Sequence, residues 1–225
     1  MIRRYWLHVL VALLLALLAA ALGFWLWARP APQPHLEHLT LANGSSLVRV
    51  SPSTRAKAQV AVAVPQDQAL SDKQLLDLSQ SADAQLVQVI LPPTDCTLQQ
   101  QSLQQALQQL QGAPTLVAGI GPGAGLAWSW LAAQQDDKAQ AISVGFSLEQ
   151  PGCTTALPKS AAHGHWNVAW NDNPDDASAA FVRDQANAQT SISDYDIHLP
   201  QVLKAQLTQA LLGEDGNALS IPVVE

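Results

Sequence analysis

Short apolar runs rich in β-forming residues alternate with amphipathic helical patterns along most of the chain, which limits the possible folds more than any other feature. The runs lie at residues 47–50, 60–64, 85–91, 115–119, 140–145, 166–170 and 190–193. Helical patterns lie at residues 71–80, 98–111, 123–135, 175–185 and 201–212. Several runs are almost wholly apolar, which is typical of strands buried on both faces of a parallel sheet. We therefore predict an α/β fold with a doubly wound, mostly parallel sheet.

The composition allows a sizeable core and argues against a nucleic-acid partner. Hydrophobic residues make up 48% of the chain and charged residues only 13%, which excludes wholesale disorder. The chain carries 11 Lys and Arg against 18 Asp and Glu. Three of the basic residues, Arg3, Arg4 and Arg29, precede the predicted sheet, so the remainder is more acidic still. Because phosphate backbones would repel such a body, we expect no nucleic acid among its partners.

The N-terminal region contains an apolar segment, residues 5–27, that would be long enough as a helix to cross a bilayer. Arg3 and Arg4 precede it, so the positive-inside tendency predicts a cytoplasmic N-terminus and a body on the far side of the membrane. We expect a signal anchor or transmembrane helix over residues 1–28, a Pro-rich spacer over 29–34 and the α/β body over 35–225. The alternative is a signal peptide cleaved after Ala19-Ala20-Ala21, which would release a soluble body.

The chain has two cysteines, Cys96 and Cys153. In an exported domain they predict a disulfide, because the compartment is oxidising. The bond would close a long loop and stabilise the fold by about 4 kcal/mol on the chain-entropy model. The alternative is a pair of unconnected buried thiols.

A glycine-rich turn follows the run at residues 115–119 and leads directly into a helical pattern. Gly119, Gly121 and Ala124 satisfy a loose dinucleotide-binding pattern. However, Pro122 removes an amide from the phosphate cradle, and no acidic residue lies about 20 positions further on. We therefore expect no nucleotide cofactor.

The same turn resembles a nucleophile elbow, G-x-S-x-G, in which a strained strand-to-helix turn presents a serine. Here residues 121–125 are aligned with the five positions of the motif. Gly121 and Gly125 match its two glycines, and Gly123 stands at the serine position. A glycine has no side chain to attack a carbonyl, so this frame predicts a degenerate elbow. The alternative is a turn whose glycines serve only close helix-to-strand packing.

Candidate partners for a catalytic triad follow the later strands. Asp172 follows the run at 166–170 and His198 follows the run at 190–193, which is the hydrolase order of acid and histidine. They are interpreted as vestigial, or as residues that begin or cap helices. After the run at 60–64, Pro65-Gln66-Asp67 replaces the glycine-rich loop that donates an oxyanion amide. Outside this constellation, Ser147 is the candidate for an unconventional nucleophile, with His198 as its base.

Two further features have structural interpretations. His163 and His165 lack a cysteine or carboxylate at ligand-like spacing, so solvated loop histidines are favoured and no metal is predicted. Trp128 and Trp130 lie two positions apart on a predicted helix. They should face different ways, one into the core and the other toward a contact surface.

The layout of the chain resembles the first half of the AcvB/VirJ family of bacterial virulence proteins. The features that carry this resemblance are the anchor, the spacer, the elbow, the pair Asp95-Cys96, and Phe146 followed by Pro151-Gly152-Cys153. Residues 219–225 resemble the segment that leads into a second α/β-hydrolase domain in that family. The resemblance implies an α/β-hydrolase-like fold, with a single-pass anchor in the inner membrane and a periplasmic body, or a soluble periplasmic body if the leader is cleaved. It also implies that the working serine belongs to the second domain.

The resemblance predicts a role in the hydrolysis of aminoacyl-phosphatidylglycerol, in which this domain is a non-catalytic accessory. Its expected partners are the inner membrane and either a second hydrolase domain or another protein of that lipid pathway. One alternative is an active serine hydrolase of lipids or esters that uses an unconventional nucleophile. Another is a secretion or virulence chaperone that binds proteins.

Overall fold

The computed structural model describes residues 33–93, 95–148, 157–170, 173–185, 188–192 and 199–213, together with Leu14, Leu15 and Leu18. The chain divides into two compact units, Met1–Gln33 and Pro34–Glu225, and the second contains the sheet. The predicted membrane segment lies outside the described residues apart from the three leucines, and remains a prediction. Within the described part of the chain, no helix is long and apolar enough to cross a bilayer.

The described strands form one eight-stranded sheet in the order β1-β2-β4-β3-β5-β6-β7-β8. They are β1 His35–Thr40, β2 Ser46–Ser51, β3 Ala58–Val64, β4 Ala84–Ile90, β5 Leu116–Ile120, β6 Gln140–Val144, β7 His165–Trp170 and β8 Ala188–Ile192. The strand β2 runs antiparallel to both of its neighbours, β1 and β4. All the other strand pairs are parallel. The prediction of a mostly parallel α/β sheet is therefore confirmed.

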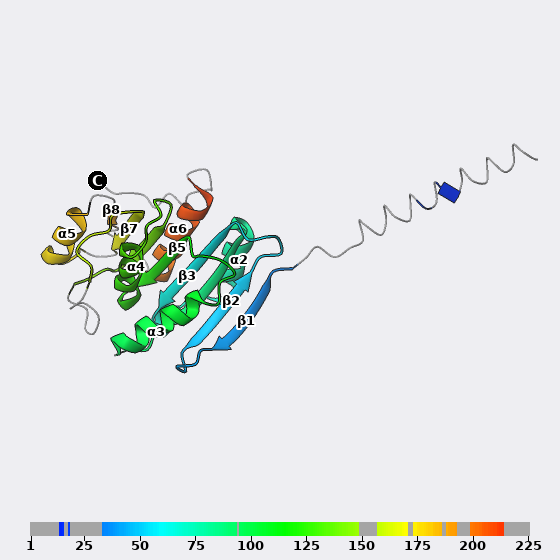
Figure 1. The fold of residues 1–225 in the computed structure, drawn as a ribbon, viewed down its shortest axis with the longest axis horizontal. Coiled ribbons are helices and arrows are strands. Elements are labelled where there is room, and N and C mark those ends of the chain that lie inside the picture. The colour runs from blue at the N-terminus through cyan, green and yellow to red at the C-terminus, as the bar shows by residue number, and fades with distance from the viewer. Residues whose placement is uncertain are drawn as a thin grey trace, which may run out of the picture. The chain divides into compact units, whose positions relative to one another are not determined.

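Helices cover both faces of this sheet (Figure 1). They are α2 Asp72–Ala82, α3 Cys96–Leu107, α4 Pro122–Ala132, α5 Asp176–Arg183 and α6 Leu199–Leu212, with a short 3-10 helix, η1, at Gln66–Gln68. On one face α2 and α6 bury leucines such as Leu75 and Leu203 against Val60 and Val62 of β3. On the other face α3 and α4 bury Leu103 and Trp128. Two apolar layers thus enclose the central strands.

The first strand, β1, was not predicted from the sequence. Its leucines, Leu36 and Leu39, are spaced by three rather than by two, so the run lacks strand periodicity. Its strand conformation comes from pairing with β2 across a turn at Asn43-Gly44, where Gly44 has φ 85°. An Asn-Gly pair between two strands is a recognised hairpin signal, and it was available in the sequence.

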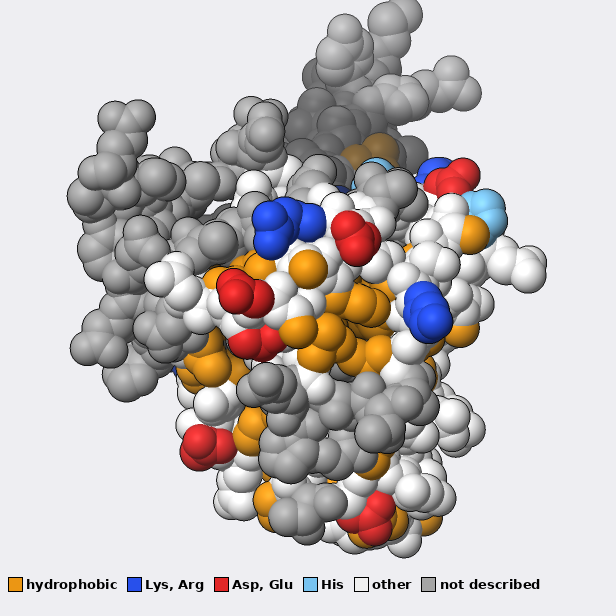
Figure 2. Space-filling model, turned by 90° about the vertical axis from the view of Figure 1, so that its left-hand side faces the viewer, with side chains coloured by type: hydrophobic (Ala, Val, Ile, Leu, Met, Phe, Trp, Pro, Cys, Tyr) orange, Lys and Arg blue, Asp and Glu red, His pale blue; other side chains and the backbone are white. Residues whose placement is uncertain are grey.

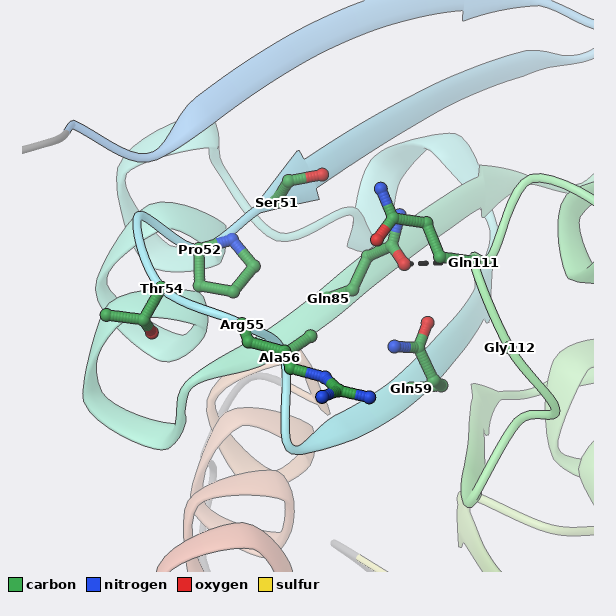
Figure 3. Close-up of a pocket in the computed structure, with 9 residues that line it drawn as sticks. All are labelled: Ser51, Pro52, Thr54, Arg55, Ala56, Gln59, Gln85, Gln111 and Gly112. Atoms are coloured by element: carbon green, nitrogen blue, oxygen red, sulfur yellow. Dashed lines mark hydrogen bonds between the residues drawn. The ribbon is translucent and has the colours of Figure 1, made fainter.

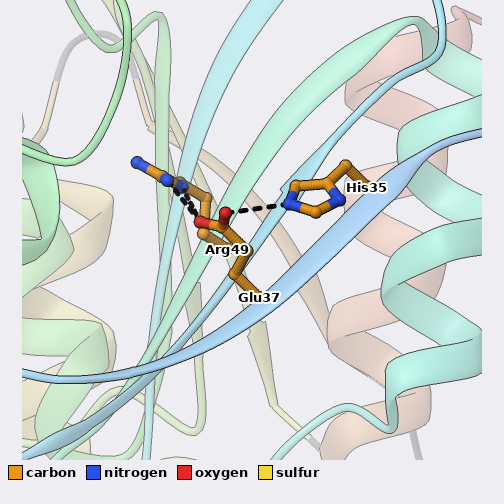
Figure 4. Close-up of polar contacts among 3 residues, drawn as sticks. All are labelled: His35, Glu37 and Arg49. Carbon is orange, nitrogen blue, oxygen red and sulfur yellow. Dashed lines mark hydrogen bonds and ion pairs between the residues drawn. The ribbon is translucent and has the colours of Figure 1, made fainter.

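Charged side chains line the outer hairpin (Figure 4). Glu37 of β1 is the register partner of Arg49 of β2, and the Arg49 guanidinium forms an ion pair with it. His35 Nε2 lies 2.8 Å from the other carboxylate oxygen of Glu37. These hydrogen bonds, that from His35 first and then those from Arg49, lower the pKa of Glu37 below its ordinary value of 4.5. Charges on a sheet-edge strand oppose pairing with further strands.

Candidate functional site

The glycine-rich segment forms a sharp turn from β5 into α4. Gly121 is the single residue between the two elements, with φ 56° and ψ −116°. This backbone conformation suits glycine and strains other residues. The Gly121 amide donates to the carbonyl of Val144 at the end of β6 (3.0 Å), and its carbonyl accepts from the Ala124 amide (2.9 Å). The turn therefore lies at the carboxyl edge of the parallel strands.

Two neighbouring glycines are required by close backbone packing. A Cβ on Gly119 would lie 2.1 Å from the carbonyl carbon and oxygen of Gly123. A Cβ on Gly123 would lie 2.0 Å from the carbonyl oxygen of Ala63 in β3. At Gly125 the nearest atom would be Cδ2 of Leu157 at 3.6 Å, an ordinary contact. The geometry therefore calls for glycine at 119, 121 and 123, but not at 125.

This result corrects the register of the elbow. The sequence frame placed Gly123 at the serine position, whereas the strained turn residue is Gly121, flanked by Gly119 and Gly123. Glycines occupy every second position from 119 to 125, so both frames fit the sequence equally well. Backbone angles and the approach of β3 distinguish them. With Gly121 at the serine position the elbow still lacks a nucleophile, because this residue, like Gly123, has no side chain.

The corrected register also removes an oxyanion donor. In this type of elbow, one donor is the amide of the residue that follows the nucleophile. Here that residue is Pro122, which has no N–H. The second donor comes from the loop after β3. That loop begins with Pro65, which also lacks an N–H and whose carbonyl accepts from Gln68 (3.1 Å).

The strands that precede the candidate triad acid and histidine end at the same edge of the sheet as β5, which leads into the elbow. The parallel strands β7 and β8 end at Trp170 and Ile192, beyond β6 in the sheet order. Asp172 and His198 follow these strands in sequence but lie outside the described residues. Their vestigial roles remain predictions.

Ser147 contributes to a polar junction between the segment after β6 and the start of α5. Its hydroxyl donates to Asp175 Oδ2 at 3.3 Å. Asp175 is the N-cap of α5 and accepts from the Ser178 amide (2.7 Å) and hydroxyl (2.5 Å), while the Leu148 amide donates to Ser178 Oγ (2.8 Å).

Asp175 is a weak candidate for a base that would activate Ser147, and the predicted base, His198, lies outside the described residues, so the Ser147 alternative remains a prediction. The Ser178 hydroxyl, followed by the Ser178 amide and Ser147, lowers the pKa of Asp175 from its ordinary 3.8. A carboxylate with a lowered pKa is a poor general base at neutral pH. The hydrogen bonds are explained by helix capping and loop attachment.

Three of the described histidines, His35, His38 and His163, contact separate carboxylates. His163 Nδ1 lies 2.7 Å from Asp137, and His38 Nε2 lies 3.0 Å from Asp72. His165 is exposed at the start of β7. In the described ranges, no group of three or more His, Cys, Asp or Glu side chains is placed to hold a metal ion.

The two tryptophans of α4 have different environments, as predicted. Trp128 is 1% exposed, and its ring centroid lies 4.1 Å from that of Trp166. Phe146 and Phe181 complete this aromatic cluster. Trp130 is only partly buried. A contact role for Trp130 remains a prediction.

The predicted disulfide includes one described cysteine. Cys96 is the first residue of α3, directly after the N-cap Asp95, whose carboxylate accepts from the Leu98 amide at 3.1 Å. Cys153 lies outside the described residues. The Cys96–Cys153 bond therefore remains a prediction.

Figure 2 shows the side of the body that carries α5. Hydrophobic side chains gather in the middle of this face, and acidic and basic side chains are scattered around them. Among the described residues in this view, the basic side chains are separated from one another. The expectation that the protein has no nucleic-acid partner remains a prediction.

The strand order, the single antiparallel strand inside the sheet and the glycine elbow after β5 define an α/β-hydrolase fold. The structure is similar to an α/β serine hydrolase homologue from Coxiella burnetii, with 15% identity, a TM-score of 0.57, and coverage of 79% of this chain and 97% of that one. It is also similar to a membrane phospholipase A described as a bacterial virulence factor, with 12% identity, a TM-score of 0.54, and coverage of 93% and 98%.

A further similarity is to the Francisella virulence factor BioJ, with 11% identity, a TM-score of 0.50, and coverage of 81% of this chain and 82% of that one. At these identities the likeness establishes the fold alone. No family model matches the chain. No curated protein matches it significantly in sequence.

Proposed function

We propose that this protein is a membrane-anchored, periplasmic member of the AcvB/VirJ type whose hydrolase-fold body is not itself catalytic. Its proposed role is that of an accessory in the hydrolysis of aminoacyl-phosphatidylglycerol. The working nucleophile belongs to a second hydrolase domain or to a partner protein.

The observation that carries the proposal is the pair Gly121-Pro122 at the strained turn. Glycine supplies no nucleophile, and proline supplies no amide for the oxyanion. Loss of one oxyanion donor alone typically lowers kcat by about 10²–10³-fold. Loss of a triad member leaves only the roughly 10³–10⁴-fold rate enhancement over water that binding and the oxyanion hole provide. Here the elbow lacks both contributions.

The membrane and lipid parts of the proposal rest on other features. The apolar N-terminal segment and the motifs around Cys96, Phe146 and Cys153 support the AcvB/VirJ resemblance. Two proteins of similar fold are named as virulence factors, and one of them is a membrane phospholipase A. The acidic body suits a cationic aminoacyl headgroup better than an anionic lipid.

A serine-directed fluorophosphonate probe tests the non-catalytic assignment. We expect the purified full chain to remain unlabelled under conditions that label an active serine hydrolase to completion. Ser147→Ala is the matched variant. Stoichiometric labelling that disappears in Ser147→Ala would establish the unconventional-nucleophile alternative. Labelling that persists in the variant would show that another serine reacts with the probe, and it too would contradict the non-catalytic assignment.

The accessory role needs a separate measurement. Membranes that contain an aminoacyl-phosphatidylglycerol hydrolase are assayed for amino-acid release with and without the full chain. Faster release in its presence is expected. Unchanged release would refute the accessory role even if the chain is unlabelled by the probe.

A further inference from the structure

A polar pocket of about 400 Å³ lies at the edge of the sheet opposite to the elbow. It is formed where β3 and β4 begin and β2 ends, and the turn after α3 closes one side. The side chains used below are Ser51, Arg55, Gln59 and Gln85 (Figure 3). Its volume falls within the roughly 300–1,000 Å³ typical of small-molecule sites.

One wall of the pocket is a buried glutamine that is only half satisfied. Gln85 is 1% exposed, and its Oε1 accepts from the Gln111 amide at 3.0 Å. This bond identifies Oε1, so Nε2 is the remaining donor, and it has no partner among the described residues. Gln88, on the same strand, shows the contrasting case. Its amide accepts from Leu70 N (2.8 Å) and donates to Leu70 O (3.0 Å).

A second amide lies next to the first. Gln59 of β3 is the register partner of Gln85 of β4, so the two side chains emerge on the same face. Gln59 Oε1 is also buried without a partner among the described residues. A buried polar group left unpaired costs about 1–3 kcal/mol. The lining of the pocket therefore contains one unsatisfied donor, on β4, and one unsatisfied acceptor, on the neighbouring strand β3.

The guanidinium of Arg55 lies on a loop that lines the pocket and that Asp83 holds in place. The Thr54 hydroxyl donates to Asp83 Oδ1 and Lys57 Nζ pairs with Oδ2, both at 2.7 Å. The Lys57 amide donates to the Asp83 carbonyl, also at 2.7 Å. Arg55 lies between these anchored residues, is exposed and has no partner in the described part of the chain. Figure 3 shows its guanidinium on the side of the pocket that holds Gln59.

We propose that this pocket binds an acidic saccharide, a hydroxyl-rich sugar that carries a carboxylate. A hydroxyl both donates and accepts, so adjacent hydroxyls satisfy Gln59 Oε1 and Gln85 Nε2 together. A carboxylate matches the planar fork of Arg55. The Ser51 hydroxyl supplies a further polar group at the end of β2. This inference is independent of the proposed function, because the pocket and the elbow lie at opposite edges of the sheet.

Saturation-transfer NMR on the full chain in mild detergent tests the proposal with three probes. Glucuronate carries both chemistries, glucose only the hydroxyls and propionate only the carboxylate. We expect glucuronate to bind with a Kd on the order of 1 mM or tighter, and glucose and propionate to bind more weakly. Absence of transfer to glucuronate, or equal binding of either single-chemistry probe, would overturn the assignment.

Variants locate the binding. Arg55→Ala changes an exposed side chain and should weaken glucuronate binding about tenfold, which corresponds to about 1.4 kcal/mol. Arg183→Ala removes an exposed arginine of α5 and is the matched control, with no expected effect. Gln85→Glu keeps an oxygen for the Gln111 amide but replaces the free donor with an anionic acceptor, so binding should be lost. Equal weakening by Arg55→Ala and Arg183→Ala would refute the site.

Discussion

Replacing Gly123 with alanine puts the packing of the elbow to a direct test. The added Cβ would lie 2.0 Å from the carbonyl oxygen, 2.8 Å from the carbonyl carbon and 3.2 Å from the Cβ of Ala63. The first two contacts are with the backbone of β3, so no side-chain rotation relieves them. The start of α4 must move away from the sheet. Overpacking of a core costs about 1–3 kcal/mol and sometimes more. We expect a loss of about 3 kcal/mol in the free energy of unfolding, at the upper end of that range.

Gly125→Ala is the matched control two residues further along the same helix. Its Cβ would meet only Leu157 Cδ2, at 3.6 Å. Alanine is favoured over glycine inside a helix by about 0.5–1 kcal/mol. This variant should therefore equal or exceed the wild type in stability. The two substitutions add the same methyl group, so the difference between their free energies of unfolding measures the effect of the close contact between Gly123 and the backbone of β3.

Urea unfolding of the full chain, followed by far-UV circular dichroism in one detergent, measures both effects. The comparison uses midpoints at a shared slope, because a changed slope would indicate an altered unfolded state. A stability change for Gly123→Ala within about 0.5 kcal/mol of zero, as at an ordinary surface position, would refute the assigned elbow register. So would equal destabilisation by the two variants.

Other expectations follow from local contacts. The pKa of Asp175 is lowered from 3.8, so its contribution to stability is complete above that pH and is lost as the pH falls through the lower folded-state value. Asp175→Asn retains an N-cap acceptor and should flatten acid unfolding in that window; identical acid unfolding profiles for the variant and the wild type would contradict this reasoning. Ser71 forms a capping box with Gln74, so Ser71→Ala should lower the free energy of unfolding in urea by about 1 kcal/mol, and an unchanged midpoint would count against the cap. If Cys96 and Cys153 are bonded, Cys153→Ser should cost about 2–5 kcal/mol, and a thiol titration that detects two free thiols in the unreduced chain would exclude the bond.

Most of the secondary structure could be predicted because its determinants are local. The apolar runs within β3 and β5 are continuous, that of β4 is interrupted only by Gln85 and Gln88, and the intervening leucines follow helical spacing. Polar residues such as Ser71 and Asp175 begin helices by accepting the first free amides. The strand β1 was missed because its pairing with β2, rather than its own periodicity, makes it a strand.

The sequence by itself determined the fold class and showed that no serine occupies the glycine-rich turn, since both follow from residue types in order along the chain. Tertiary structure decided which glycine occupies the turn, because only the carbonyl of Ala63 and the backbone angles of Gly121 distinguish frames that are equivalent in sequence. It also decided that Gln59 and Gln85 face one pocket. Gln59 and Gln85 are neighbours because of the register between the parallel strands β3 and β4, which the helix α2 joins. That register depends on contacts between residues far apart in sequence.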